Sequence, residues 1–87
     1  MLEHLPRIDL LDGPTQFQRL RRLEAKTGHG SLWAKRDDVA ALGLGGNKLR
    51  SLEYWVAEAG QRGCDMLVVA GAPESNQCRL TAAAAAR

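Results

Sequence analysis

Residues 65–86 read DMLVVAGAPESNQCRLTAAAAA, and this stretch decides the fold. The continuous apolar run at 65–70 is typical of a strand that is buried on both faces of a sheet. A glycine–alanine–proline turn follows it, and Ser75 or Asn76 can cap a helix that continues through the alanine-rich run. A strand, a turn and a helix in this order indicate an α/β protein with a mostly parallel sheet.

The sequence before this stretch supports the same alternation. Apolar residues at three-residue steps predict a short amphipathic helix from about residue 15 to residue 28. A short strand is expected at 31–35, followed by a glycine-rich loop at 36–46. Apolar residues at helical spacing then predict a helix at 48–61: Leu49, Leu52, Val56 and Ala59. This order predicts an open, mostly parallel sheet with flanking helices and right-handed crossovers.

The chain has 87 residues, which is enough for one domain at most. Two strands cannot form a self-sufficient parallel sheet, and the last predicted helix has no capping glycine and no strand after it. We therefore interpret residues 1–87 as a single partial domain, the amino-terminal piece of a longer protein. A complete small domain that dimerises to finish its sheet is the alternative.

Composition narrows the class of protein. A hydrophobic content of 45% and a charged content of 25% are typical of a soluble globular protein. The net charge of +2 and the scattered basic residues predict no nucleic-acid partner. No apolar run approaches the roughly 20 residues that a membrane-spanning helix needs. Cys64 and Cys78 lack metal-ligand spacing, so we expect free thiols, no metal and a cytoplasmic location.

The first candidate site is the loop GLGGNK at 43–48, which leads from irregular backbone into a helix start. Helix starts carry free amide donors and favour anionic ligands. Lys48 stands there, and its amine can condense with a carbonyl compound; a glycine turn with a solvated lysine is the plain alternative. The loop fits neither the phosphate loop of nucleotide hydrolases, which needs Ser or Thr after the lysine, nor the dinucleotide fingerprint, which needs glycine at position 48.

The second candidate site is the loop GAPESNQ at 71–77, after the predicted strand. In open α/β folds, ligands bind at the edge where the parallel strands end. Ser75 and Asn76 offer a hydroxyl and an amide to a bound group, and simple helix capping is the alternative.

Other polar and aromatic residues are interpreted as structural. The charged run KRDD at 35–38 is expected to form surface ion pairs. Trp33, Tyr54 and Trp55 have the spacing of core or interface positions, and we expect them to pack.

Four segments of the chain occur in a recognisable order. They are GPT at 13–15, LWAKRDD at 32–38, GLGGNKLRSLEY at 43–54 and VVAGAPESNQCRLTAAAAA at 68–86. Together they resemble the D-cysteine desulfhydrase and aminocyclopropane-carboxylate (ACC) deaminase family of pyridoxal-phosphate enzymes, which has the tryptophan-synthase-β-like fold (fold type II). The resemblance covers nearly all of this chain and only the opening part of a family member.

The resemblance implies a role for each residue of the two loops. Lys48 matches the lysine that binds pyridoxal 5′-phosphate covalently and later moves protons at the substrate α-carbon, and Asn47 shapes its loop. Asn76 matches the asparagine that hydrogen-bonds the cofactor ring hydroxyl. Ser75 matches a catalytic serine that contacts the substrate carboxylate or takes part in proton transfer. Asn76 and Gln77 belong to the same substrate-facing turn.

The family also implies an activity on a small amino acid. One reaction converts D-cysteine to pyruvate, ammonia and hydrogen sulfide, and the other converts ACC to 2-oxobutanoate and ammonia; the SNQ triplet leans towards the deaminase. A homodimer is expected for the full-length protein. The family's phosphate-binding loop and pyridine-nitrogen partner come later in the chain, so we expect residues 1–87 alone to be inactive. A non-catalytic remnant and a small phosphate-ligand-binding α/β module are the alternatives.

This chain departs from the family pattern at two positions. Gln16 stands where proline is usual after GPT, a structural change of small concern. Glu74 precedes the SN pair where glutamine is usual just before the serine. A carboxylate at position 74 would alter the substrate choice or simply face solvent.

Overall fold

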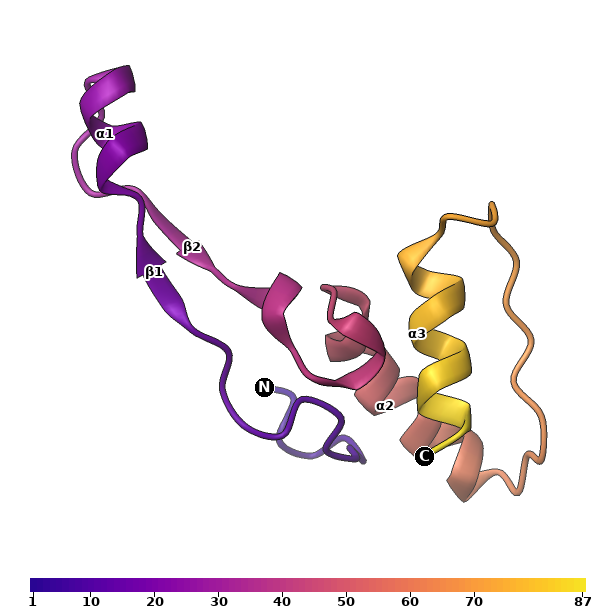
Figure 1. The fold of residues 1–87 in the computed structure, drawn as a ribbon. Helices are drawn as coiled ribbons and strands as arrows, with labels where there is room; N and C mark the ends of the chain where they lie inside the picture. The colour runs from indigo at the N-terminus through magenta and orange to yellow at the C-terminus, as the bar shows by residue number, and fades with distance from the viewer.

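The computed structural model describes all 87 residues and divides into an elongated arm and a body (Figure 1). The arm consists of β1 (Phe17–Arg19), α1 (Arg21–Thr27) and β2 (Trp33–Lys35). The body consists of two 3₁₀ turns, η1 (Asp37–Val39) and η2 (Leu42–Leu44), and two helices, α2 (Lys48–Gln61) and α3 (Asn76–Ala85), with residues 7–12 beside them. The molecule measures 51 × 34 × 18 Å, and the arm extends from one end of it.

Helix α2 has the predicted bounds and buries the predicted face. Leu49 and Leu52 are buried, and Val56 packs against the same cluster. The backbone then leaves the helix at Gly63, whose φ of +70° is a left-handed conformation that glycine adopts without strain. The prediction of a helix at 48–61 is confirmed.

Helix α3 begins where the capping signal placed it. Ser75 has an extended backbone, and its Oγ accepts a hydrogen bond from the Cys78 amide at 3.4 Å. This bond satisfies one of the free amide donors of the first turn. The alanine-rich body then continues the helix to Ala85 because alanine has the highest helix propensity.

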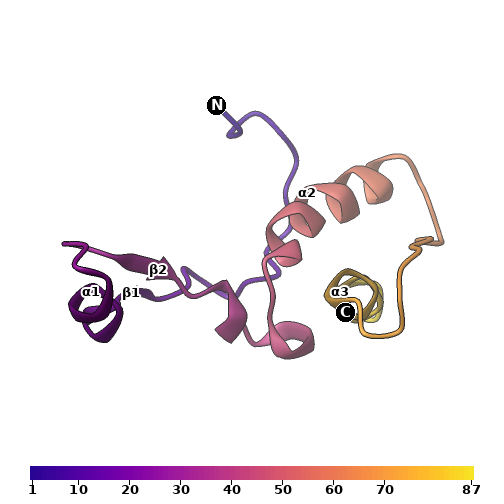
Figure 2. The ribbon, with the colours of Figure 1, turned by 90° about the horizontal axis from the view of Figure 1, so that it is seen from above.

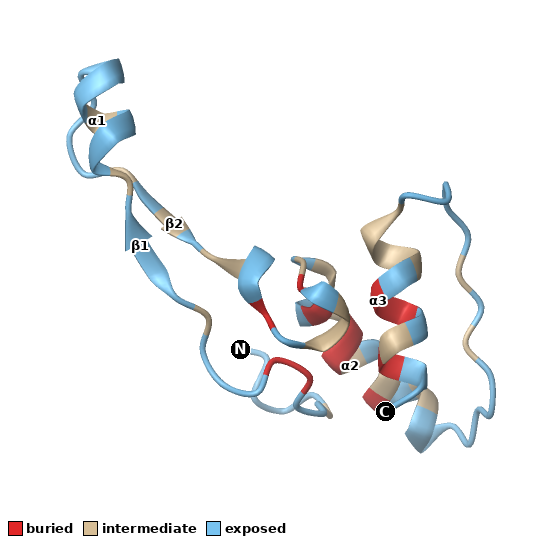
Figure 3. Ribbon diagram, in the orientation of Figure 1, coloured by how far each residue is buried: buried red, intermediate tan, exposed pale blue.

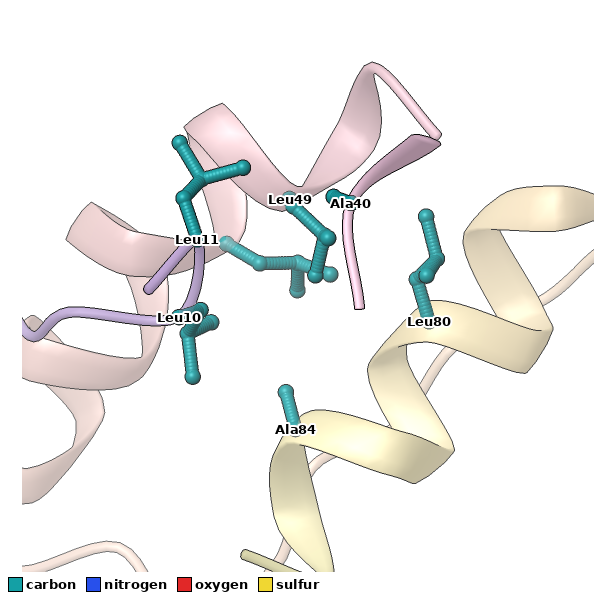
Figure 4. Packing of buried hydrophobic residues seen from close by; sticks show 7 residues of the cluster. Leu10, Leu11, Ala40, Leu49, Leu80 and Ala84 are labelled. Atoms are coloured by element: carbon teal, nitrogen blue, oxygen red, sulfur yellow. The ribbon is translucent and has the colours of Figure 1, made fainter. Parts of the chain in front are cut away.

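One hydrophobic cluster holds the body together, and the buried residues of the chain lie in the body (Figure 3). Leu49 of α2 and Leu80 of α3 are completely buried, and the two side chains enter the cluster from opposite helices (Figure 4). Burying a leucine side chain contributes roughly 1.5–3 kcal/mol, so these two are major contributors to the free energy of folding. The other members are Leu10, Leu11, Ala40, Leu52 and Ala84.

The arm has no buried residue from position 12 to position 39. Strands β1 and β2 are antiparallel, with Gln18 opposite Ala34, and the rings of Phe17 and Trp33 stack at 5.0 Å. The prediction of a helix from residue 15 is therefore wrong at its start, since residues 17–19 hydrogen-bond to a strand instead. The predicted end is confirmed, because Gly28 closes α1 in a left-handed conformation.

Two aromatic residues that were expected to pack are largely exposed. Trp33 contacts Phe17 but lies half in solvent, and Trp55 is likewise half-exposed on α2. Tyr54 is partly buried. Neither tryptophan is therefore a core residue within residues 1–87, and an interface position for them stays a prediction.

The predicted strand at 65–70 is not a strand in the structure. Residues 64–72 form no regular element, and Val68 is 89% exposed. A strand needs a neighbour to satisfy its backbone groups, and no other segment of residues 1–87 lies alongside this one as a strand. The only sheet is the antiparallel β1–β2 pair, so the predicted parallel sheet is absent from these residues. None of the helices combines the length and the apolar character that crossing a bilayer requires.

Candidate functional site

The loop at 43–48, here called the lysine loop, has a backbone that requires glycine at position 45. Gly45 is buried with φ +75°, and a Cβ atom on it would lie 2.5 Å from the Asp38 carbonyl oxygen. The Gly46 amide donates to the Asp37 carbonyl oxygen at 2.8 Å. The loop is therefore fastened to η1 by close backbone contact, and Lys48 follows it as the first residue of α2.

The starts of α2 and α3 meet at this loop. The Asn76 side-chain amide donates to Asn47 Oδ1 at 3.2 Å, and an Arg79 guanidinium nitrogen donates to the Gly45 carbonyl at 3.2 Å. A Cβ on Gly46 would lie 2.8 Å from a Leu80 methyl carbon and 3.2 Å from the Asn76 amide nitrogen. Seen along α3 in Figure 2, the two helices lie side by side, as the shared core requires.

The structure brings the predicted site residues of the two loops to this meeting point, with different exposures. Lys48, Ser75 and Asn76 are half-buried, while Asn47 is exposed. Gln77 takes no part in the Asn47–Asn76 contact, and it lines a separate apolar pocket of about 200 Å³ between α2 and residues 67–69. Glu74, whose role was open, is exposed before the helix.

These groups fit a lysine-anchored aldehyde cofactor. Lys48 supplies an amine, the two asparagines supply amides, and Ser75 supplies a hydroxyl. Gly46 has no side chain, so its backbone packs directly against Leu80 and the Asn76 amide, and this holds the two helix starts close together. The two amides can hydrogen-bond the polar substituents of an aromatic ring bound here. The lysine amine can condense with an aldehyde on that ring.

A charged cluster behind the lysine loop was not predicted. Arg50 donates to both Asp37 carboxylate oxygens, at 2.7 Å each, and the Thr15 hydroxyl donates to the same carboxylate at 2.8 Å. The hydrogen bonds from Arg50, and then that from Thr15, lower the pKa of Asp37 from 3.8 to about 2, against an opposing effect of burial. The expected surface ion pair exists between Arg36 and Asp38, but Asp37 faces inward. The sequence signal was the arginine two positions after Lys48, which can pair with one acid of the KRDD run.

Glu53 is a buried charged residue that no sequence pattern indicated. Its carboxylate pairs with Arg7, and its main-chain carbonyl accepts the Ile8 amide at 3.1 Å. The side chain is 1% exposed, and one of its oxygens, Oε1, has no hydrogen-bond partner. Glu53 therefore fastens the amino-terminal segment to the back of α2.

Known proteins share both the sequence and the geometry. Residues 8–87 match the family described as "Pyridoxal-phosphate dependent enzyme". Over 86 residues, or 99% of the chain, the sequence is 49% identical to D-cysteine desulfhydrase of Yersinia enterocolitica (serotype O:8 / biotype 1B) and 46% identical to D-cysteine desulfhydrase of Salmonella paratyphi B. The aligned part is 26% of each relative, so the chain spans about a quarter of the length of the curated relatives that it matches.

A solved structure agrees with the sequence relatives. It is described as "Crystal Structure Analysis of the ACC deaminase homologue", and it superposes with a TM-score of 0.87 at 37% sequence identity. The match covers 95% of this chain and 25% of that protein. Family profile, relatives and structure thus cover the same nearly complete stretch, and they confirm the resemblance carried by the four motifs. The chain belongs to the pyridoxal-phosphate-dependent enzyme family.

Proposed function

We propose that the protein carrying this chain is a pyridoxal-phosphate-dependent lyase or deaminase that acts on a small amino acid. The observation that carries the proposal is the position of Lys48 at the start of α2, beside the Asn47–Asn76 amide contact that joins the two helix starts. Membership of a family of pyridoxal-phosphate enzymes supports the same assignment.

Each residue of the site has a distinct task in this proposal. When bound, pyridoxal 5′-phosphate supplies an electron sink for bond breaking at the substrate α-carbon. Lys48 would hold the cofactor and move a proton at that carbon, and Asn76 would hydrogen-bond its ring with support from Asn47. Ser75 accepts a bond from the Cys78 amide, which leaves its own hydroxyl proton free to donate to a substrate carboxylate.

D-cysteine is the first substrate to test, and ACC is the second. Two relatives that are 49% and 46% identical bear the name D-cysteine desulfhydrase, while the solved ACC deaminase homologue is 37% identical. Conversion of D-cysteine would give pyruvate, ammonia and hydrogen sulfide, and conversion of ACC would give 2-oxobutanoate and ammonia. Gln77 and Glu74, next to the serine, are the residues of this chain that we assign to substrate choice.

We also propose what the rest of the protein supplies to residues 1–87. Residues 65–70 carry alternating exposure, with Met66 and Val68 open to solvent, which supports a strand of a parallel sheet completed by the remainder of the protein. The residues that hold the cofactor phosphate and the pyridine nitrogen would come from that remainder. We further propose a cytoplasmic homodimer.

The test is covalent capture of the cofactor. The full-length protein is incubated with pyridoxal 5′-phosphate and reduced with borohydride, and the modified lysine is located by peptide mass spectrometry. We expect the label on Lys48, together with release of pyruvate from D-cysteine or of 2-oxobutanoate from ACC. Reversible binding without a trapped adduct would instead favour a phosphate-ligand-binding module, and no binding at all would favour a non-catalytic remnant.

The matched control uses the 87-residue chain alone with excess cofactor. We expect no turnover above that of free pyridoxal phosphate, because an incompletely held ring does not align the substrate bond that breaks, and such positioning accounts for much of catalysis. Turnover that is lost in Lys48→Ala would show that residues 1–87 contain a complete site.

A further inference from the structure

Asp37 contacts the chain on both sides of Lys48. Its main-chain carbonyl accepts the Gly46 amide at 2.8 Å, two residues before the lysine. Its carboxylate accepts two hydrogen bonds from Arg50 at 2.7 Å each, two residues after the lysine. One residue outside the loop therefore fixes the backbone that enters α2 and the first turn of α2 itself.

Thr15 completes this contact and connects it to the arm. Its hydroxyl lies 2.8 Å from Asp37 Oδ1 and 3.0 Å from an Arg50 guanidinium nitrogen. Its main-chain carbonyl accepts a hydrogen bond from the Lys35 ammonium at 2.5 Å. The cluster of Thr15, Asp37 and Arg50, here called the clamp, thus joins residues that are up to 35 positions apart in the chain.

The clamp differs from the ordinary ion pair beside it. Arg36 and Asp38 also form a two-point contact at 2.8 Å, but the Asp38 side chain is 64% exposed, against 18% for Asp37. Exposed pairs contribute about 0–1 kcal/mol, whereas a bidentate pair with a third partner at a sheltered carboxylate fixes geometry as well. The Arg36–Asp38 side chains make no hydrogen bond to the lysine loop, so they form a matched internal control.

We propose that the Thr15–Asp37–Arg50 clamp positions the lysine loop, and that Asp37 is a positioning residue for the chemistry at Lys48. The proposal rests on the proposed function, since it assigns the clamp to the same lysine. Its physical basis is that the lysine amine must reach a reacting carbon with little freedom of its backbone, and a displacement of about 1 Å at such a site can lower a rate 100-fold.

The experiment compares Asp37→Asn with Asp38→Asn, two neighbouring substitutions that remove the same charge. In the full-length protein, the rate of borohydride-trapped labelling by pyridoxal 5′-phosphate is measured at Lys48 and, as an internal reference, at Lys26. We expect Asp37→Asn to lower the rate at Lys48 by about tenfold to 100-fold at saturating cofactor and to leave Lys26 unchanged. Asp38→Asn should leave both rates within about twofold, because the Asp38 side chain is exposed and makes no hydrogen bond to the lysine loop.

Two further variants separate positioning from general destabilisation. Arg50→Lys keeps the charge but loses the two-point contact, so labelling at Lys48 should still fall. The double variant Asp37→Asn/Arg50→Gln should be labelled at Lys48 no more slowly than either single variant, because the two substitutions remove the same interaction. If Asp37→Asn fails to fold, Arg50→Lys provides the same comparison.

A second readout does not need the cofactor. Amide hydrogen exchange at Gly46 should be faster in Asp37→Asn than in Asp38→Asn, since Gly46 donates to the Asp37 carbonyl. Equal labelling rates and equal exchange in the two variants would overturn the clamp. Faster exchange with no adduct on Lys48 in the unaltered protein would support the clamp as a holder of the loop and overturn the proposed function instead.

Discussion

The arm and the body of this molecule are made by different kinds of contact. The body packs α2, α3 and the two turns around a leucine cluster, and every buried residue of the chain lies in it or in the adjoining residues 10–11. The arm, from β1 to β2, has two three-residue strands, one aromatic stack and no buried residue. Isolated two-stranded ribbons are marginally stable, so the arm should open at lower free energy than the body.

The proposed site lies in the part of the molecule where backbone positions are fixed by packing. Lys48, Ser75 and Asn76 stand on the two helices that share the core, whereas Lys26 and Lys35 stand on the arm. Only the body therefore offers a lysine beside the packed core, with hydrogen bonds that hold the loop before it.

Lys48→Ala should abolish both the borohydride-trapped adduct and turnover in the full-length protein, because no other side chain there supplies an amine at the helix start. The measurement is adduct mass together with pyruvate and 2-oxobutanoate release. Lys26→Ala on the arm is the control and should retain both. An adduct that moves to Lys26 or Lys35 in the unaltered protein would place the chemistry in the arm and break the comparison.

Leu80→Ala should lower the free energy of unfolding by about 2–5 kcal/mol, because Leu80 is completely buried between the helices. Leu23→Ala on the arm makes the same chemical change at a side chain that is 46% exposed, and it should cost well under half as much. Urea unfolding followed by circular dichroism measures both. Similar losses for the two variants would mean that the arm is as tightly packed as the body.

Ser75→Ala should lower turnover by about 100-fold while the free energy of unfolding falls by only ~1 kcal/mol, the usual effect of losing a helix cap. Asn76→Ala should weaken cofactor binding as well, since it removes the amide that bridges the two helix starts. Steady-state kinetics and thermal melting separate the two effects. Unchanged turnover with a lower melting temperature would leave Ser75 as a cap and nothing more.

The smallest predicted effect concerns the stability of the fold at low pH. The pKa of Asp37 is lowered in the fold to about 2 from 3.8, so its ionised form stabilises the fold above pH ~4, and this contribution is lost as the pH falls through about 2. Because the group is partly screened by solvent, we expect a loss of about 1–2 kcal/mol over that window. Unfolding measured between pH 5 and pH 2 should show the loss in the unaltered chain and in Asp38→Asn, and a flatter profile in Asp37→Asn. Identical profiles in the two variants would contradict the assignment.

The sequence signals that succeeded were local. A serine cap, an alanine-rich run and leucines at helical spacing act within one or two turns, and both α2 and α3 follow them. The spacing of Phe17, Leu20 and Leu23 suits a helix, but residues 17–19 pair with β2, where Gln18 lies opposite Ala34, 16 positions along the chain. Residues 65–70 have a strand pattern but no neighbouring strand within the chain.

The candidate site shows the same division. The positions of Lys48, Ser75 and Asn76 at helix starts could be predicted from the turn signals beside them, and their roles at the site stay a prediction. The Asn47–Asn76 contact spans 29 positions and the Thr15–Arg50 contact spans 35, so neither follows from local pattern. The inward direction of Asp37, against the outward direction of Asp38, depends on how η1 turns and is likewise invisible in the sequence.

The fastening of Gly46 and Arg50 to Asp37 has a consequence for the order of folding. The Asp37–Arg50 contact closes a loop of only 13 residues, whereas Leu80 reaches Leu49 across more than twice that length. Short closures lose little chain entropy and form early, and long ones follow. We therefore expect the backbone around Lys48 to reach its native course before α3 docks, so that the last helix arrives with Asn76 at a lysine loop that is already shaped.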